Sequence, residues 1–509
     1  MDIGLFFGAG AEIGYGLPTG GKFAIDLFRQ DPSEYRKKFR EKLKKIDKRS
    51  IYASSWLPQG FENKSIFVFG KNEFTSIIES SIQYRKNEII TKLNNFDEEF
   101  KKALKLLNVN EDSLKCLFFK DLNKEIGEVI YSQDIQLNEK LAQDVKLFSS
   151  EYYSACLELI RTQPNSADLK RYTIAFLQLL VGSYGQEFVK NLNEELFVKT
   201  PDDLPIFDDI YGMFRLEFDR VGSTALELLL SEQRTFNTET SIKSGNSIEV
   251  FSAISQKILE DLFCHVLDYQ KLIDDHFRYL FSPCTEWAKF TRMAIFLEIA
   301  QDYIVKQVPK TLEEDGYYHD VKKIMKRGHE VSVIGTSNYN SLFQRVCEKS
   351  GIDINKISIY HLNGSTEDYY NPYKNEITKI SSCDPDENQI LVPFILTQSG
   401  LKPLTSVEMS RRYVDLFDAY KTKDAIVSIG FGFNEDDSHI NGLFRDLIEK
   451  HNKKLYVVTI DNQENVEKLK RKLRLSSNFN NLKMIQVNSE TRKTSKSKFW
   501  FDKIIQMNT

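Results

Sequence analysis

The first eight residues of this 509-residue chain constrain its fold more than any other stretch. DIGLFFG (2–8) is an apolar strand pattern that runs directly into a loop with four glycines between positions 8 and 16. A lone strand cannot bury itself, so it must pair with strands found elsewhere in the sequence. The other strand-like segments come late, at 331–335, 357–364, 388–396, 424–430, 454–460 and 482–487. The sequence therefore predicts a sheet that joins the two ends of the chain.

Helical segments lie between most of the late strands, and several of these strands are continuous Val/Ile runs flanked by Gly, Asn or Asp. This alternation is typical of a parallel sheet covered by helices. We expect an α/β fold with a Rossmann-like parallel sheet of about six strands, interrupted by a large all-helical insertion. The expected boundaries are 1–75 and 329–490 for the two parts of the sheet domain, 76–328 for the insertion and 491–509 for a C-terminal helix.

The middle of the chain carries helical periodicity with almost no strand pattern. One helix face is marked by Leu169, Tyr172, Phe176, Leu179 and Leu180. A second helix is expected after Asn246, which lies three residues before Glu249 as in a capping box.

Composition excludes several classes of function. The chain has no run of about 18 apolar residues and no secretory signal pattern, so we expect a cytoplasmic protein that does not enter a membrane. The net charge of −4 gives no general attraction to nucleic acid, and the basic run at 35–49 has the spacing of a solvated helix face. The six cysteines form no Cys-x-x-Cys pair, so neither a zinc ribbon nor a dithiol site is expected.

The glycine loop is suited to close approach by a ligand. Glycine permits positive φ and lets a phosphate reach backbone amides. The spacing differs from G-x-G-x-x-G because the third glycine comes one residue late, and no Gly-Lys-Ser/Thr follows. Taken alone, the loop is equally consistent with nucleotide binding and with a tight structural turn.

Five blocks in chain order resemble the sirtuin family. The Gly-Ala-Gly turn at 8–10 and the Gly-Leu-Pro at 16–18 are similar to the family's Gly-Ala-Gly and Gly-Ile-Pro. TSNYN (336–340) resembles Thr-Gln-Asn-Ile-Asp, and YHLNGS (360–365) resembles a strand that ends in His-Gly-Ser. IGFGFNEDD (429–437) and VVTIDN (457–462) resemble the two later strand ends.

Within that family, the chain is most similar to bacterial anti-phage members that hydrolyse NAD, which share the long helical insertion. Deacylating sirtuins carry a four-cysteine zinc module, and the corresponding interval here holds only Cys383. The resemblance therefore implies an NAD+ hydrolase that takes NAD+ as its substrate, releases nicotinamide and ADP-ribose, and needs no metal. It also implies a defence effector that depletes cellular NAD, with an activating protein partner from the same defence system and assembly as a homo- or hetero-oligomer.

The resemblance also implies site residues. Asn338 would contact the nicotinamide-side ribose and position the nucleophile, since an amide is both donor and acceptor. Amides of Gly8, Ala9 and Gly10 would meet the pyrophosphate, and Asp461 would accept from the adenosine ribose. The expected cofactor contacts are Gly8, Ala9, Gly10, Ala11, Glu12, Pro18, Thr336, Ser337, Gly364, Ser365, Gly430, Gly432, Asp461 and Asn462.

The identity of the catalytic base stays open in the sequence. The family has His directly before the Gly, whereas this chain has Asn363 there and His361 two positions earlier. Residues two apart on a strand face the same side, so both are expected to point into one space. Either His361 serves as the base after a small register change, or Asn363 holds a water without a base, or catalysis is lost. His439, with Asp436 and Asp437, is a weak alternative as a metal site.

Three functions arise from these alternatives. The first is the NAD+ hydrolase, and the second is a protein that binds NAD or ADP-ribose without turnover. The third is an NAD-dependent protein deacylase, which the missing zinc cysteines disfavour. All three require that the opening turn and Asn338 meet across one crevice.

Overall fold

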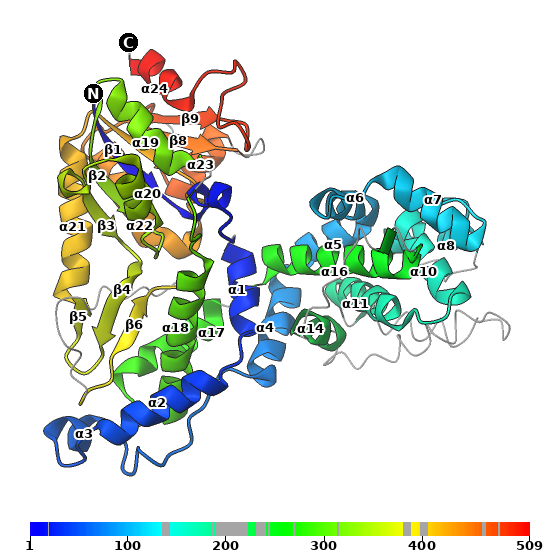
Figure 1. The fold of residues 1–509 in the computed structure, drawn as a ribbon, viewed down its shortest axis with the longest axis horizontal. Coiled ribbons are helices and arrows are strands. Elements are labelled where there is room, and N and C mark those ends of the chain that lie inside the picture. Colours follow the sequence, from blue (N-terminus) through cyan, green and yellow to red (C-terminus); the bar gives the residue numbers. More distant parts are fainter. Residues whose placement is uncertain are drawn as a thin grey trace. The chain divides into compact units, whose positions relative to one another are not determined.

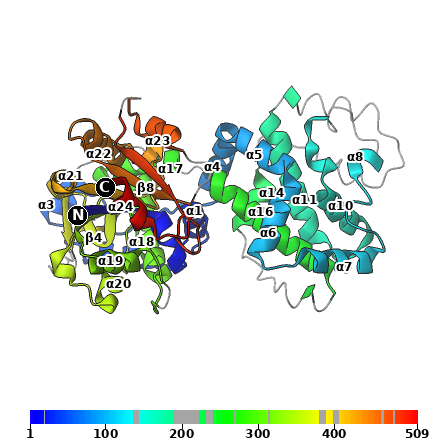
Figure 2. The same ribbon diagram turned by 90° about the horizontal axis from the view of Figure 1, so that it is seen from above.

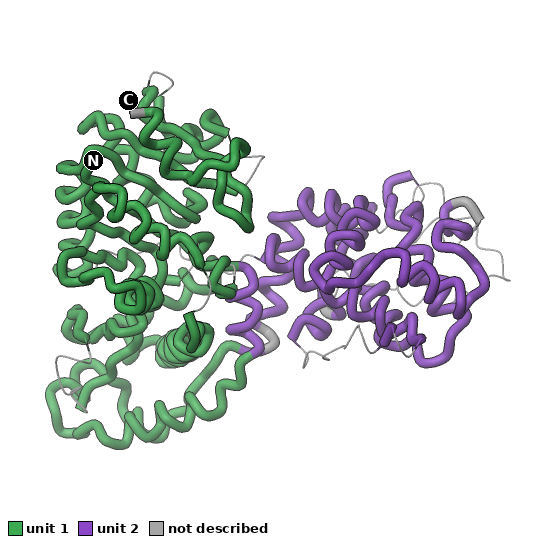
Figure 3. The backbone as a smooth tube through the Cα atoms, turned by 45° about the horizontal axis from the view of Figure 1, so that its top comes forward, with its two compact units in different colours: residues 1–20, 30–69, 269–509 green, residues 21–29, 70–268 purple. Residues whose placement is uncertain are grey.

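The computed structural model of the chain describes residues 1–18, 20–134, 143–185, 187–188, 222–230, 241–242, 245–267, 270–312, 315–379, 388–397, 406–460, 465–476 and 479–508. These fall into two compact units, which Figure 3 colours separately. Unit 1 covers residues 1–20, 30–69 and 269–509, and unit 2 covers residues 21–29 and 70–268.

The strands of unit 1 form two sheets. Their bounds are β1 Asp2–Phe7, β2 Glu330–Thr336, β3 Ser358–His361, β4 Gly364–Asn371, β5 Glu376–Lys379, β6 Val392–Ile395, β7 Ala425–Ile429, β8 Leu455–Thr459 and β9 Leu482–Gln486. The helices of this unit are α2 Ser33–Lys45, α3 Ile51–Trp56, α17 Gln270–Phe277, α18 Trp287–Gln307, α19 Tyr317–Lys326, α20 Leu342–Ser350, α21 Val407–Thr422, α22 Ser438–Glu449, α23 Val466–Leu473 and α24 Trp500–Asn508.

The larger sheet is six-stranded, with the order β3-β2-β1-β7-β8-β9, and every pairing in it is parallel (Figure 1). The expectation that the first strand returns to the late strands is confirmed, because β1 lies between β2 and β7. Counted along the chain, the parallel strands stand in the order 3-2-1-4-5-6, which is the doubly wound Rossmann arrangement. In such a sheet the order reverses beside the first strand, and a crevice opens there at the carboxyl ends.

Helices cover both faces of this sheet. Ile3, Leu5 and Phe7 of β1 point to one face, where they join the core formed with α19, α20 and α24. Phe6 points to the other face and meets Phe444 of α22, with ring centroids 5.1 Å apart. Figure 2 shows α19 and α20 on one side of the strands and α21 and α22 on the opposite side. This two-sided burial explains why β1 reads DIGLFF without polar alternation.

One expected strand belongs to a different sheet. The segment 388–396 contains β6, which pairs antiparallel with β4 in a three-stranded sheet of order β5-β4-β6. The prediction that it joins the parallel sheet is therefore wrong. Helix α18 packs on this second sheet, where Gln301 Nε2 donates to the carbonyl oxygen of Thr366 at 2.8 Å. The pairing partner of an apolar strand is decided by such tertiary contacts, which the strand's own pattern does not contain.

Unit 2 is helical in its described part. Its helices are α1 Gly20–Phe28, α4 Lys71–Tyr84, α5 Lys86–Asn94, α6 Phe96–Leu106, α7 Glu111–Leu122, α8 Tyr131–Asp134, α10 Glu151–Thr162, α11 Ala167–Tyr184, α14 Ser223–Leu230 and α16 Ser247–Val266. The predicted face of α11 is buried, and α11 packs against α16. Asn246 caps α16 by accepting from the amide of Glu249 at 3.1 Å, whereas the Glu249 side chain accepts from Ser241 instead of closing a capping box.

The compact units have other boundaries than the expected insertion of 76–328. Residues 269–328 pack with unit 1, since α18 covers the second sheet and α19 packs on β2 and α20. Residues 21–29 join unit 2, where Arg29 pairs with Glu260 at 2.9 Å. The expected C-terminal helix is α24, and its Trp500 and Phe501 are buried in the core of unit 1. Within the described ranges, no helix combines the length and apolarity that a membrane crossing requires.

A buried ion pair joins the second sheet to α21. Arg412 Nη1 and Nη2 donate to the two carboxylate oxygens of Asp368 at 2.7 and 3.0 Å. Asp368 is 1% exposed, and burial acts to raise its pKa, but the Arg412 bonds outweigh burial and hold the pKa below its ordinary value. Arg412 also donates to the carbonyl of His361 at 3.4 Å, so the pair braces the end of β3.

We predict that Arg412→Ala destabilises the chain by ~3–5 kcal/mol, because it leaves a buried carboxylate without its partner. Chemical denaturation followed by circular dichroism measures the loss. Arg411→Ala removes the neighbouring exposed arginine and is the matched control. Equal denaturation midpoints for the two variants would contradict the assignment.

Candidate functional site at the switch point of the sheet

The carboxyl ends of β1 and β7 carry two loops that touch backbone to backbone. The amide of Gly8 donates to the carbonyl of Ile429 at 2.9 Å, and the amide of Gly10 donates to the carbonyl of Gly430 at 2.8 Å. Gly430 has φ +68°, and a Cβ there would lie 2.1 Å from the nitrogen of Ala11. A Cβ on Gly8 would lie 2.6 Å from the carbonyl oxygen of Gly430. These glycines are therefore required by loop contact, before any ligand is considered.

The structure gives the turn amides a different role from the expected one. Gly8 and Gly10 donate to the β7 side as above, and Ala11 and Glu12 donate to Gly8 and Ala9 within the turn, each at 3.0 Å. Among the described contacts, the amide of Ala9 is the one of this group with no acceptor in the chain. The expectation that Gly8 and Gly10 offer their amides to a pyrophosphate is therefore corrected. Only the exposed Ala9 remains suited to that task.

The helix expected to follow this loop also lies elsewhere. Residues 9–11 and 13–15 form two short 3-10 turns, and α1 begins only at Gly20. Residues 21–28 of α1 belong to unit 2. Two short 3-10 turns therefore separate the end of β1 from the start of α1.

A cavity of about 780 Å³ opens beside the turn, within the range of sites that hold small ligands. It is bounded by the turn itself, the 430–434 loop, the ends of β8 and β9, and the residues before and within the first turn of α19. The expected cofactor contacts that line it are Gly10, Ala11, Gly430 and Gly432. Asp461 and Asn462 lie outside the described residues, although Ile460 directly before them lines the cavity.

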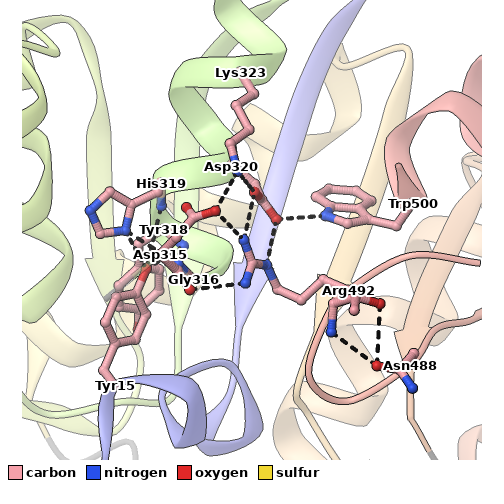
Figure 4. A network of polar contacts seen from close by, with 11 residues as sticks. Tyr15, Asp315, Gly316, Tyr318, His319, Asp320, Lys323, Asn488, Arg492 and Trp500 are labelled. Atoms are coloured by element: carbon pink, nitrogen blue, oxygen red, sulfur yellow. Dashed lines mark hydrogen bonds and ion pairs between the residues drawn. The ribbon is translucent and has the colours of Figure 1, made fainter. Parts of the chain in front are cut away.

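A charged network, drawn in Figure 4, includes Arg492 and Asp315, which line this cavity. Arg492 donates through Nε to Asp320 at 3.1 Å and through Nη2 to Asp315 at 2.8 Å. Asp320 is fully buried and also accepts from the Trp500 indole at 2.9 Å. The C-terminal segment and the start of α19 are thereby fixed to each other. Nothing in the sequence patterns pointed to this network.

Asn338 lies at the end of β2 and touches the opening turn. Its Nδ2 donates to the carbonyl of Gly8 at 3.1 Å and to the hydroxyl of Tyr318 at 3.1 Å. The Thr336 hydroxyl fixes the loop, since it donates to the carbonyl of Phe7 and accepts from the amide of Asn338, each at 2.9 Å. The backbone amide of Ser337 also donates a hydrogen bond to the carbonyl of Phe7 at 3.1 Å. The turn and Asn338, 330 positions apart, are thus in direct contact, although Asn338 is buried and is not among the described residues that line the cavity.

Glu12 is buried behind the turn and does not line the cavity. Its carboxylate accepts from the Tyr318 hydroxyl at 2.6 Å and from Asn340 Nδ2 at 2.8 Å. The side chain is 5% exposed, and this burial raises its pKa from 4.5 to about 7 against the lowering effect of those bonds. Glu12 was expected on the ribose wall, but the structure places it among interior polar groups.

The prediction that His361 and Asn363 point into one space is wrong, because β3 ends at His361 and Gly364 turns the chain with φ +83°. His361 Nδ1 bonds the carbonyl of Asn338 at 2.8 Å, and its Nε2 contacts Gln344 Nε2 at 3.2 Å. Burial lowers the pKa of His361, so the ring is neutral at neutral pH. Asn363 instead contacts His439 of α22, with Oδ1 and Nε2 3.4 Å apart.

The remaining residues that were expected to contact the cofactor form contacts within the fold. A Cβ on Gly364 would lie 1.9 Å from the Phe394 carbonyl oxygen, so this glycine serves strand contact. Ser365 is buried and accepts from the amide of Glu367 at 3.3 Å. Pro18 is partly exposed, and neither it nor Ser365 is among the described residues that line the cavity. Sequence reasoning missed Tyr318, for which no sequence signal exists, and Asn340, which lies inside the matched TSNYN block.

A scan of protein-family models gives no match to this chain, and no curated protein matches it. A functional assignment therefore depends on the geometry of the site and on the chain's own sequence motifs.

We predict that Gly430→Ala destabilises the chain by more than ~1–2 kcal/mol, the backbone cost of a left-handed alanine, since its Cβ also clashes with the opening turn. Gly14→Ala is the matched control, because a Cβ there meets no atom within 4 Å. Thermal unfolding distinguishes them. Similar melting temperatures for the two variants would contradict the loop contact.

We predict a pH-dependent stability contribution from Glu12. The Glu12 carboxyl loses its proton near pH 4.5 in the unfolded chain and near pH 7 in the folded chain. Below pH 4.5 both states are protonated, so Glu12 does not change the free energy of unfolding there. As the pH rises from 4.5 to 7, the unfolded state is favoured and the free energy of unfolding falls. The loss amounts to ~3 kcal/mol. Glu12→Gln lacks this titrating carboxyl. The melting temperature of the wild type should therefore fall relative to that of the variant between pH 5 and pH 8. Glu376→Gln, an exposed change on β5, should run parallel to the wild type.

Proposed function

We propose that the chain is an NAD+ hydrolase that cleaves the bond between nicotinamide and ribose. The observation that carries the proposal is the contact of Asn338 Nδ2 with the Gly8 carbonyl, at the point where the strand order reverses. A cavity of about 780 Å³ adjoins the same turn and is lined by Gly430 and Gly432. The five sequence blocks that resemble sirtuins add the choice of NAD over other dinucleotides.

In this proposal the adenosine half of NAD occupies the cavity, and the pyrophosphate crosses the turn at the exposed Ala9. The nicotinamide ribose then faces Asn338. Water bonds to C1′ of that ribose while the bond from C1′ to nicotinamide breaks, and nicotinamide leaves as a neutral molecule with the electron pair. The proton of the water passes to a base.

We assign that base to His439. His361 already bonds Asn338 through one ring nitrogen and contacts Gln344 through the other. His439 is partly exposed and faces Asn363, the residue directly before Gly364. In this assignment Asn363 orients the imidazole, and the histidine comes from helix α22 instead of from the strand end that carries it in the family pattern.

The biological part of the proposal follows the resemblance. Uncontrolled NAD cleavage is toxic, so an anti-phage effector of this kind must be inactive until triggered. Unit 2 is the proposed docking surface for an activating protein partner or for further copies of the chain. The proposal takes NAD+ as the substrate and involves no metal in the reaction.

A second candidate is an NAD or ADP-ribose sensor without turnover. One observation favours it: His361, the histidine nearest to the family's His-Gly-Ser position, is engaged at both ring nitrogens. Such a protein would still bind the dinucleotide in the same cavity.

We predict that the purified chain binds NAD, measured by calorimetry, and releases nicotinamide, measured by chromatography with and without an acyl-lysine peptide. Asn338→Ala should lower turnover by ~10²-fold or more, as removal of a key polar group does. Asn355→Ala, an exposed amide on the same unit, is the control. His439→Ala should lower turnover while NAD still binds.

The outcomes separate the functions. Release that needs no peptide supports the hydrolase, and release only with the peptide supports a deacylase. Tight binding without release supports the sensor. Absence of NAD binding contradicts both the hydrolase and the sensor.

A further inference from the structure

The hydroxyl of Tyr318 lies between Glu12 and Asn338. It donates to Glu12 Oε1 at 2.6 Å and accepts from Asn338 Nδ2 at 3.1 Å. Tyr318 is 1% exposed and comes from the first turn of α19. The proposed reaction uses neither Tyr318 nor Glu12, so this buried pair needs an explanation of its own.

The contacts fix which way the Asn338 carboxamide faces. A backbone carbonyl only accepts, so the atom beside the Gly8 oxygen must be Nδ2. Tyr318 has one hydroxyl hydrogen and gives it to Glu12, so it faces Asn338 with a lone pair. Both hydrogens of Nδ2 therefore have acceptors. What Asn338 can offer a ligand is its carbonyl oxygen Oδ1, as an acceptor.

Glu12 is itself held in one orientation. Its Oε2 accepts from Asn340 Nδ2 at 2.8 Å, and Asn340 Oδ1 accepts from the amide of Leu342 at 2.9 Å. The two carboxamides of this chain of bonds are each fixed by a backbone group, Asn338 by the Gly8 carbonyl and Asn340 by the Leu342 amide. The network joins three segments, namely the opening turn, the start of α19 and the loop after β2.

Two neighbouring residues at the start of α19 face different surroundings. Tyr317 lines the cavity, whereas its neighbour Tyr318 points to Asn338. The Tyr15 hydroxyl accepts from the amide of Tyr318 at 3.0 Å, which holds the backbone of this turn independently of the Tyr318 hydroxyl. Loss of that hydroxyl should therefore leave the cavity intact.

We infer that Glu12 and Tyr318 are positioning residues that hold the Asn338 carboxamide with Oδ1 turned toward the substrate ribose. The inference rests on the proposed NAD cleavage. Both side chains act through Asn338, since the Glu12 carboxylate and the Tyr318 hydroxyl form their printed hydrogen bonds with groups of this network.

The first test is Tyr318→Phe, which deletes one oxygen and keeps the ring packing. We expect kcat for nicotinamide release to fall roughly 10- to 100-fold, the cost of a small misplacement, with KM and the NAD dissociation constant changed by less than about twofold. Tyr153→Phe is the matched control, because it removes a buried tyrosine hydroxyl in unit 2 that bonds the Thr173 carbonyl at 3.1 Å. Tyr153→Phe should lower the melting temperature about as much as Tyr318→Phe does and leave kcat unchanged.

The second test reverses one bond of the network. Glu12→Gln sets the amide nitrogen of Gln against Asn340 Nδ2, two donors face to face, and kcat should fall. Adding Asn340→Asp restores an acceptor for that nitrogen and for the Leu342 amide, so the double variant should recover most of the lost kcat. A purely structural role would restore melting temperature without restoring kcat.

The results distinguish the positioning role from the proposed function. A wild-type chain that never releases nicotinamide overturns the proposed function and this inference with it. A wild type that turns over NAD while Tyr318→Phe keeps full kcat overturns this inference alone. So does a double variant that stays as slow as Glu12→Gln.

Discussion

The insertion of β1 between β2 and β7 is the constraint on which the rest of the structure depends. Phe7, at the end of β1, lies beside Thr336 and Ile429, the first of them 329 residues away in the chain. Five of the six β1 residues are buried, so the strand has no stable state until both neighbours are present. Parallel pairing over such a separation carries a large loop-closure cost, which burial on both faces of the sheet must offset.

This insertion also creates the site. It puts the turn after β1 at the reversal of strand order, where the 430 loop, the loop after β2 and the start of α19 converge. Close backbone contact there leaves no room for side chains at Gly8 or Gly430. The buried carboxylate of Glu12 at the same place is bonded at both oxygens. The crevice is therefore built around contacts that the fold itself requires.

The sequence analysis predicted the features that depend on local pattern, such as the strands, and missed those that depend on tertiary contacts, such as strand pairing. The apolar runs gave the strands of the parallel sheet, and TSNYN placed Asn338 correctly at a strand end. The sequence analysis did not predict the β4–β5 hairpin or the separate sheet that contains β6, because the pattern of an apolar strand does not specify its pairing partner. His361 and Asn363 point to different places because the left-handed backbone of Gly364 interrupts the regular alternation of side chains along the strand. Tyr318 and Arg492 act from segments whose own sequences carry no site pattern, so only the fold reveals them.

The groups already engaged in the fold limit how the cavity can hold a ligand. The guanidinium of Arg492 is paired with Asp315 and Asp320, and most turn amides donate to neighbouring carbonyls. Lys472 also lines the cavity, and its Nζ donates to the Gly432 carbonyl at 3.1 Å, so the cavity does not present the set of unengaged amides that a glycine-rich loop before a helix offers a phosphate. The cavity instead presents apolar and aromatic side chains, among them Tyr317, Phe431 and Met484. In the proposed complex with NAD, burial of the adenosine half against these surfaces would contribute to the affinity at roughly 25 cal/mol for each Å² of apolar surface removed from water.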